Sequence, residues 1–203
     1  MASGSLSQLL RASQTVFTFR EIALLWRETD FNAAKSRVNY YVRKAELYPL
    51  RRGIYAKDRQ YDRLELATKI FTPAYVSLET VLQQEGVIFQ SDRRIHVASY
   101  LTREIECDGS TFIFRKLRDS ILVNPSGIEQ KQFAFASKER AFMDALYLYK
   151  DYHFDNLVGI DWDACFALLP VYGQKSMEKR LKSYCALIDR AISKKTLDLT
   201  VNS

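Results

Sequence analysis

The N-terminal part of the chain alternates apolar stripes with polar breaks, and the stripes recur at helical spacing. Residues 5–12 carry leucines on one face of a predicted helix. Residues 18–26 form a second stripe, and Thr18 followed by Glu21 is the sequence signature of a capping box at its start. A third helix is predicted over residues 35–47, with apolar side chains on one face and polar ones on the other.

The pattern changes after Leu47. Pro49 lacks a backbone donor and would clash with the preceding turn, so the helix cannot continue. Gly53 permits a tight turn, and residues 54–56 read as a short strand. Three helices followed by a short basic hairpin are the order of elements in a winged helix-turn-helix. The sequence therefore predicts such a domain over residues 1–60.

The rest of the chain mixes helical and strand-like patterns beyond a polar boundary stretch at residues 58–62. The predicted helices cover residues 64–71, 78–84 with Ser77 as the N-cap, 138–148 after Ser137, and most of 160–192. The predicted strands cover residues 87–90, 95–99, 103–107, 111–116 and 133–136. Asp108-Gly109 between two of these strands is a hairpin signal. The expected fold class is therefore α+β, with the winged helix-turn-helix followed by a mixed strand–helix domain over residues 61–203.

Charge is distributed unevenly along the chain. The net charge is +6, and residues 1–60 hold eleven basic and five acidic side chains, so all of the excess positive charge lies in the first predicted domain. A basic module on a neutral body is typical of phosphate binding. The alternative is a solvated basic surface without a partner.

The sequence excludes several other classes of protein and site. It contains no Gly-rich phosphate loop, no HExxH and no GxSxG, so we expect no enzyme. Three widely spaced cysteines and two histidines give no metal-binding pattern, so we expect no cofactor: Cys107, Cys165, Cys185, His96 and His153. No targeting signal or membrane-spanning stretch is visible, so we expect a cytoplasmic protein without a membrane partner.

The third helix is the predicted reader of DNA, because one helix fits the major groove and its N-terminal half meets base edges. The candidates for base contacts are Lys35, Ser36, Arg37, Asn39 and Tyr40. The candidates for phosphate contacts are Arg43 and Lys44 on the helix and Arg51, Arg52 and Lys57 in the hairpin. In the alternative interpretation, this unit is a protein-interaction module and its basic face is incidental.

A metal-dependent nuclease is a second alternative. Asp108 or Asp119 precedes Glu129-Gln130-Lys131, and carboxylates near a lysine could hold Mg²⁺ beside a scissile phosphate. This pattern arises readily by chance in a chain with 27% charged residues. His96 lacks partners in the local sequence and is interpreted as a packed or surface histidine rather than a general base.

Three stretches resemble the AbiEi-type antitoxins of type IV toxin–antitoxin systems. Residues 50–55 are similar to that family's L-x-R-G-x-Y wing. Residues 74–82 resemble its YVS-x-x-S/T-AL segment, with Val81 where Ala is frequent, and residues 135–146 resemble ASPERALLDLL, with Lys138 where Pro is usual. The likeness spans residues 18–148 and does not extend to the tail.

The resemblance implies a protein with two functions. The N-terminal domain would bind inverted repeats in double-stranded operator DNA and repress its own operon. An operator with two half-sites would take a homodimer. The C-terminal domain would oppose a nucleotidyltransferase-like toxin, and antitoxins of such systems are thought to act without a stable complex with the toxin.

Overall fold

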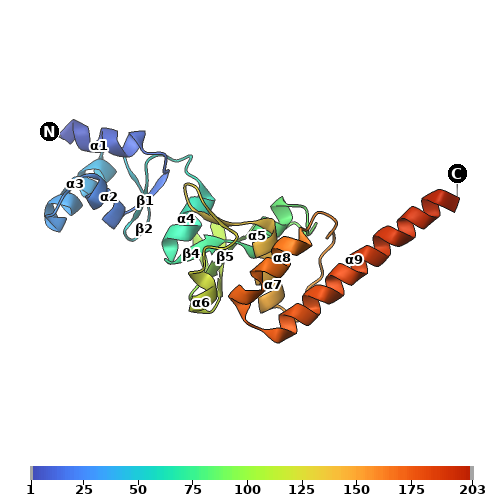
Figure 1. Cartoon of the computed structure of the whole chain (residues 1–203). Helices are drawn as coiled ribbons and strands as arrows, with labels where there is room; N and C mark the ends of the chain where they lie inside the picture. Colours follow the sequence, from blue (N-terminus) through green and yellow to red (C-terminus); the bar gives the residue numbers. More distant parts are fainter. Residues whose placement is uncertain (1, 202–203) are drawn as a thin grey trace.

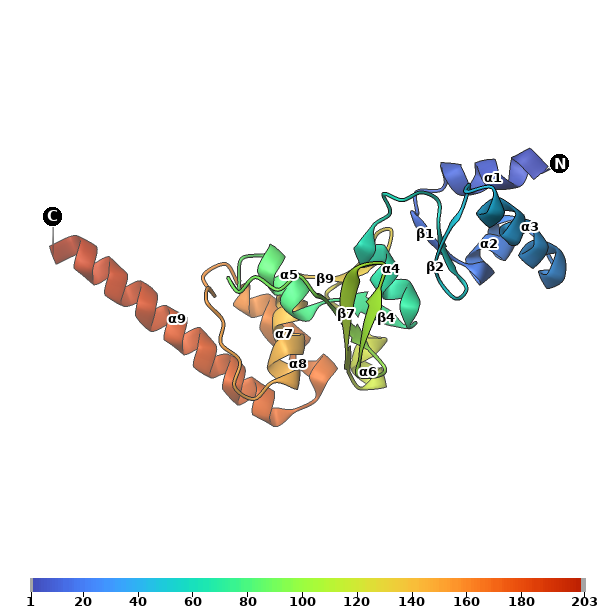
Figure 2. The same cartoon turned by 180° about the vertical axis from the view of Figure 1, so that it is seen from behind.

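The computed structural model describes the backbone of residues 2–201 and the side chains of residues 6–188. The molecule is elongated, with helix α1 near one end and helix α9 extending away from the other (Figures 1 and 2). The fold is α+β, as the sequence predicts. In the described part of the chain, no helix is long and apolar enough to span a bilayer.

The N-terminal unit packs three helices against a small antiparallel sheet with the strand order β1-β3-β2. Its elements are α1 (Ala2–Arg11), β1 (Val16–Thr18), α2 (Phe19–Leu25), α3 (Phe31–Arg43), β2 (Tyr48–Arg51) and β3 (Ile54–Ala56). The core of this unit contains Leu9, Phe17, Ile22, Trp26, Val38, Tyr41 and Leu47. Strand β1, which the sequence does not predict, pairs with β3 and brings the start of α2 beside the β2–β3 hairpin.

A six-stranded mixed sheet with the order β6-β7-β5-β4-β9-β8 forms the centre of the molecule. Its strands are β4 (Ala74–Val76), β5 (Ile95–Ser99), β6 (Arg103–Cys107), β7 (Ser110–Lys116), β8 (Ile128–Gln130) and β9 (Ala134–Ala136). Strands β5 and β7 run parallel, as do β4 and β9, while the other neighbours are antiparallel.

The remaining helices pack on this sheet or on one another. They are α4 (Arg63–Ile70), α5 (Leu78–Gln84), α6 (Asp119–Leu122), α7 (Lys138–Leu148), α8 (Trp162–Tyr172) and α9 (Lys175–Val201). Helix α7 packs against α5 and α8, and α8 packs against the first part of α9. The rest of α9 runs clear of the body of the molecule in both views (Figures 1 and 2).

Local signals in the sequence predict several boundaries correctly. Thr18 and Glu21 form both hydrogen bonds of a capping box, and Asp108-Gly109 joins β6 to β7 with both residues at positive φ. The predicted strand at residues 87–90 is wrong, because the structure has no strand there. The short elements α6 and β8 were not predicted.

Ser77 was predicted to cap α5, but its side chain makes no capping bond. The Ser77 hydroxyl instead donates to Asp144 Oδ2 at 2.8 Å, and Tyr75 donates to the same oxygen at 2.8 Å. Tyr172 donates to Asp144 Oδ1 at 2.7 Å. This carboxylate is fully buried and lies 3.2 Å from the guanidinium of Arg140, one turn earlier on α7.

Arg140 is itself fully buried, and its guanidinium uses its remaining donors on nearby acceptors: Tyr75 Oη at 2.8 Å and the carbonyls of Ile121, Asn124 and Ser126 at 2.7, 3.3 and 2.7 Å. Burial alone would lower the pKa of Arg140, but the charge of Asp144 outweighs it and raises the pKa. Two of the stretches that resemble the antitoxins, residues 74–82 and 135–146, therefore meet in one buried polar network.

Apolar side chains from both halves of the chain share a second cluster. Val16 and Ile54 of the small sheet pack with Leu66 of α4 and with Phe112 and Phe114 of β7. The core of the small sheet therefore extends across the predicted boundary at residues 58–62.

Candidate nucleic-acid interface

Helix α3 presents one polar face to solvent. The carboxylate of Asp30 caps it, accepting the amides of Asn32 at 2.8 Å and Ala33 at 3.3 Å. Ala34, Val38 and Tyr41 are buried on the opposite face. The burial of this apolar stripe fixes which side chains point outward.

The helix begins four residues earlier than the sequence analysis predicts, at Phe31 rather than Lys35. Its N-terminal half therefore includes Asn32, which was not a candidate. Asn39 and Tyr40, predicted near its start, lie in its second half. The Asp30 cap was the available signal, since Asp followed by a helical pattern is a common N-terminus.

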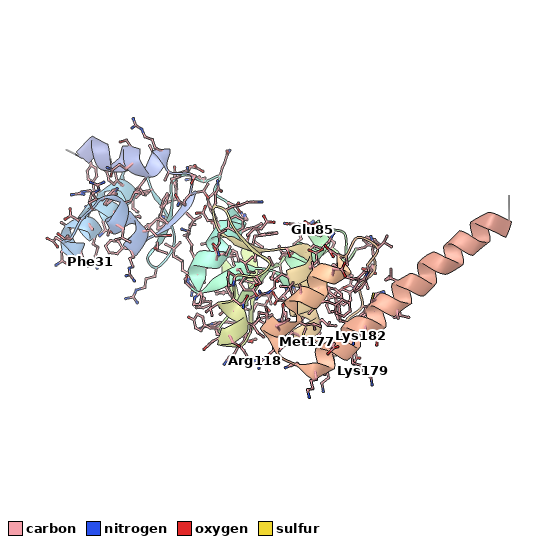
Figure 3. All side chains as sticks on the ribbon, in the orientation of Figure 1. Phe31, Glu85, Arg118, Met177, Lys179 and Lys182 are labelled. Atoms are coloured by element: carbon pink, nitrogen blue, oxygen red, sulfur yellow. The ribbon has the colours of Figure 1, made fainter. Side chains whose placement is uncertain are left out.

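Most of the predicted contact residues on α3 are exposed. Lys35, Ser36, Asn39, Tyr40, Arg43 and Lys44 all face solvent. With Asn32, they follow the i, i+3/i+4, i+7, i+11 spacing of a stripe along one helix face. Phe31 stands at the outer end of this unit, away from the large sheet (Figure 3). The exposed side chains of the stripe are accessible to a ligand that lies along the helix.

Arg37 is the exception among these candidates. Its Nη2 lies 3.1 Å from Glu28 Oε2, and the guanidinium is 5.3 Å from the centroid of the Trp26 ring. Only 32% of the side chain is exposed. Arg37 must leave Glu28 before it can contact a base, and a pair of this kind typically contributes about 0–1 kcal/mol.

The β2–β3 hairpin places Arg51 and Arg52 at its exposed turn. Gly53 follows with φ +75°, a conformation that favours glycine. The Gly53 carbonyl accepts the amide of Phe19 at 2.8 Å, which fixes the turn beside the first residue of α2. The position of this basic turn relative to the helices is thus determined by a backbone hydrogen bond.

Lys57 lies apart from that turn, at the other end of β3. Its ammonium group donates to the carbonyl of Ala12 at 2.9 Å and is half-buried. The structure therefore places Lys57 as a tie between the sheet and the end of α1, and does not bring it together with Arg51 and Arg52.

Helix α4 anchors this unit from the other side. The buried carboxylate of Glu65 accepts from Thr15 N and Thr15 Oγ1 at 2.7 Å each and from Val16 N at 3.2 Å. Lys69 lies 2.6 Å from Glu21 of α2. Burial raises the pKa of Glu21, but Lys69 and Thr18 outweigh it and lower the pKa. These contacts fix α2 and β1 relative to the large sheet.

The residues considered for a nuclease are dispersed. Glu129 of the edge strand β8 pairs at 2.6 Å with Lys131, which follows the strand, and both are exposed. Asp108 accepts from Tyr61 Oη at 2.6 Å in the β6–β7 turn, and Asp119 begins α6. Among residues with described side chains, no group of three or more His, Cys, Asp or Glu could hold a metal ion.

His96 has partners that the local sequence does not reveal. It is buried on β5 with one ring nitrogen near Glu79 and the other near Asp92. Glu79 precedes it by seventeen positions and comes from α5, so only the fold brings the two together. This cluster belongs to the large sheet and is separate from the polar stripe on α3.

No model of a known protein family matches the chain and no curated protein matches it, so its likeness to the AbiEi-type antitoxins rests on the three stretches of sequence.

Proposed function

We propose that the chain is a DNA-binding transcriptional autorepressor and the antitoxin of a type IV toxin–antitoxin system, opposing a nucleotidyltransferase-like toxin. In this proposal the N-terminal unit is a winged helix-turn-helix, with α2 and α3 as its two helices and β2–β3 as its wing. The observation that carries the proposal is the exposed polar stripe on α3, on a unit that holds all of the net positive charge.

The side chains on the stripe suit a division of roles in the major groove. Asn32 and Asn39 carry the amide that pairs with adenine through two hydrogen bonds, and Lys35 can donate to guanine. Arg43 and Lys44, further along the helix, would contact phosphates. Arg51 and Arg52 at the hairpin turn would contact the backbone or a neighbouring minor groove.

Support for the antitoxin role comes from the resemblance. Its second and third stretches supply Tyr75, Ser77, Arg140 and Asp144, which share hydrogen bonds in the core. This network joins the two stretches structurally, and the antitoxin role itself rests on the resemblance. The operator would have two half-sites bound by a homodimer.

A protein-interaction role for the N-terminal unit is the second candidate. Leu24 and Phe31 are 69% and 62% exposed on α2 and α3. Large apolar side chains that are exposed to water favour contact with another protein. The same unit could use these side chains instead of the polar stripe.

A gel-shift titration against the DNA upstream of this protein's own gene distinguishes the two candidates. Random DNA is the competitor, and each titration is done at two salt concentrations. Specific binding that weakens with salt supports the repressor, because each neutralised phosphate releases counterions. Failure to bind specifically at low salt overturns it and favours the protein-interaction role. Co-expression with the adjacent toxin gene tests the antitoxin role separately, by rescue of growth.

A further inference from the structure

His96 lies between two carboxylates in the interior of the large sheet. Its side chain is 4% exposed. Nδ1 is 2.9 Å from Glu79 Oε2 of α5, and Nε2 is 3.0 Å from Asp92 Oδ2 of the irregular segment between α5 and β5. The His96 amide donates to Thr80 Oγ1 at 2.7 Å, which fixes the backbone beside the ring.

Two carboxylates this close to the ring favour a proton on each ring nitrogen. The contact of Nε2 with Asp92 has hydrogen-bond geometry, whereas the contact of Nδ1 with Glu79 is an ion pair by distance alone. A neutral imidazole has one N–H, so its other nitrogen would direct a lone pair at a carboxylate oxygen. Asp92 also accepts three side-chain hydrogen bonds from Arg94, at 2.8, 2.9 and 3.0 Å. Arg94 and His96 lower the pKa of the Asp92 carboxyl, so this group stays ionised and the extra proton resides on the imidazole.

Further charged and titratable groups interact with the residues that flank the ring: Tyr149 and Tyr152 with Glu79, Tyr152 also with Asp92, and Glu104 of β6 with Arg94. Tyr149 and Tyr152 follow α7, and their rings stack with centroids 5.2 Å apart. Arg115 of β7 and Glu79 both interact with Tyr149, and burial raises the pKa of this tyrosine to about 12, so it is neutral. Burial lowers the pKa of His96, but Glu79 and Asp92 outweigh it and raise the pKa above 6.5.

The segment before β5 is held at two points. At one end, the carbonyl of Val87 accepts the amides of Asp155 and Asn156 at 3.0 Å, and the Phe89 amide donates to Asp155 Oδ2 at 2.7 Å. At the other end, the contact between Asp92 and His96 joins it to the sheet. Between these points the segment has no helix or strand.

We propose that the second proton on His96 is a latch that holds residues 90–94 against β5, and that its loss at higher pH releases them. The proton leaves Nε2 for solvent, and the ring keeps one N–H. Glu79, on a packed helix, stays beside Nδ1, which carries that N–H. Asp92 has an alternative partner in Arg94, which is 51% exposed, so the two can move into water together.

The test uses the full chain and its two histidines. His153 is 82% exposed and gives a comparison signal in NMR spectra of the ring protons, which follow the titration of His96. We expect His96 to titrate above 6.5. Hydrogen exchange, corrected for the intrinsic effect of pH, then measures protection of residues 90–94. Protection should fall about tenfold per pH unit between 6.5 and the pKa of His96, and then level off.

Three variants make the test specific. His153→Gln should keep the wild-type profile. His96→Gln should show low protection of residues 90–94 at every pH. Asp92→Asn should lower the pKa of His96 and remove the pH dependence, which keeps the test usable if His96→Gln does not fold. A wild-type His96 that titrates at or below 6.5, or protection that stays constant through its titration, overturns the proposal.

Discussion

Glu28 holds Arg37 on the flank of α3, with 3.1 Å between Oε2 and Nη2. Asn39, on the same helix, is exposed. If α3 reads DNA, Asn39 can contact a base without rearrangement, whereas Arg37 must first break an ion pair. The two side chains should therefore behave differently when they are removed.

We expect Asn39→Ala to weaken binding to the operator by about 1–3 kcal/mol and to affect random DNA much less. Arg37→Ala should weaken binding less than Asn39→Ala. Arg37 must break its ion pair with Glu28 before it contacts DNA, and that cost cancels part of the free energy that its DNA contact contributes. Gel-shift titrations of both variants on both DNAs measure the difference. Equal losses on operator and random DNA for Asn39→Ala would exclude base reading by this residue.

Arg52→Ala should weaken binding to all sequences about equally, because phosphate contacts carry no sequence information. The slope of log K against the logarithm of the salt concentration should fall in magnitude by about one for each phosphate contact that is lost. Lys57→Ala is the matched control, since Lys57 is tied to Ala12 and lies away from the hairpin turn. If both variants changed the salt dependence alike, the wing would not be the contact point.

Removal of Arg140 should strongly destabilise the fold. Arg140→Met leaves Asp144 buried without its counter-charge, and we expect a loss of about 3–5 kcal/mol in the free energy of unfolding. Tyr75→Phe removes one shared hydroxyl and should cost about 1–3 kcal/mol. Urea denaturation measures both. Lys182→Ala breaks only the exposed pair with Glu178 and should cost less than about 1 kcal/mol.

Gly127 should tolerate substitution less well than another glycine with the same backbone conformation. Gly127 and Gly109 both have φ +72°, so alanine is strained at either position. A Cβ at Gly127 would lie 2.9 Å from Arg140 Cβ, whereas nothing lies within 4 Å at Gly109. Gly127→Ala should therefore lower the melting temperature more than Gly109→Ala. An equal decrease would show that the contact with Arg140 relaxes freely.

Stability should decline on both sides of an intermediate pH. The pKa of Asp92 is lowered in the fold, so the stability it contributes is present above its unfolded pKa of about 3.8 and is lost as the pH falls through its folded pKa. The pKa of His96 is raised, so its contribution is present below about 6.5 and is lost as the pH rises through the folded pKa. The free energy of unfolding, measured by urea denaturation as a function of pH, should fall at both low and high pH. Asp92→Asn should make both decreases smaller.

The sequence predicts features whose partners are close along the chain. Thr18 and Glu21 are three residues apart, and Asp108-Gly109 forms its turn from adjacent residues, so local propensity determines both. The prediction that Ser77 caps α5 is wrong because its hydroxyl donates to Asp144, 67 residues later in the chain. The sequence offers no local signal for such a pair.

In the candidate site too, local signals can be read from the sequence, whereas contacts between distant residues cannot. The composition of α3 and the distribution of charge identify the helix, but tertiary contacts determine which of its side chains are free. On α3, the ion pair with Glu28 holds Arg37, and outside the helix the carbonyl of Ala12 accepts a hydrogen bond from Lys57. Strands β1 and β8 have three residues each, too few to show a period. Pairing with β3 and burial of Val16 and Phe17 stabilise β1, and pairing with β9 stabilises β8.

Val16 and Ile54 belong to the small sheet but pack against α4 and the large sheet. A fragment cut at residue 60 would expose these side chains to water and would lose the Glu65 acceptor for Thr15. We therefore expect heat to unfold the two units in a single cooperative transition. We therefore expect the N-terminal unit to fold poorly when it is fused to another protein without the residues that follow it, because those residues cover its apolar inner surface.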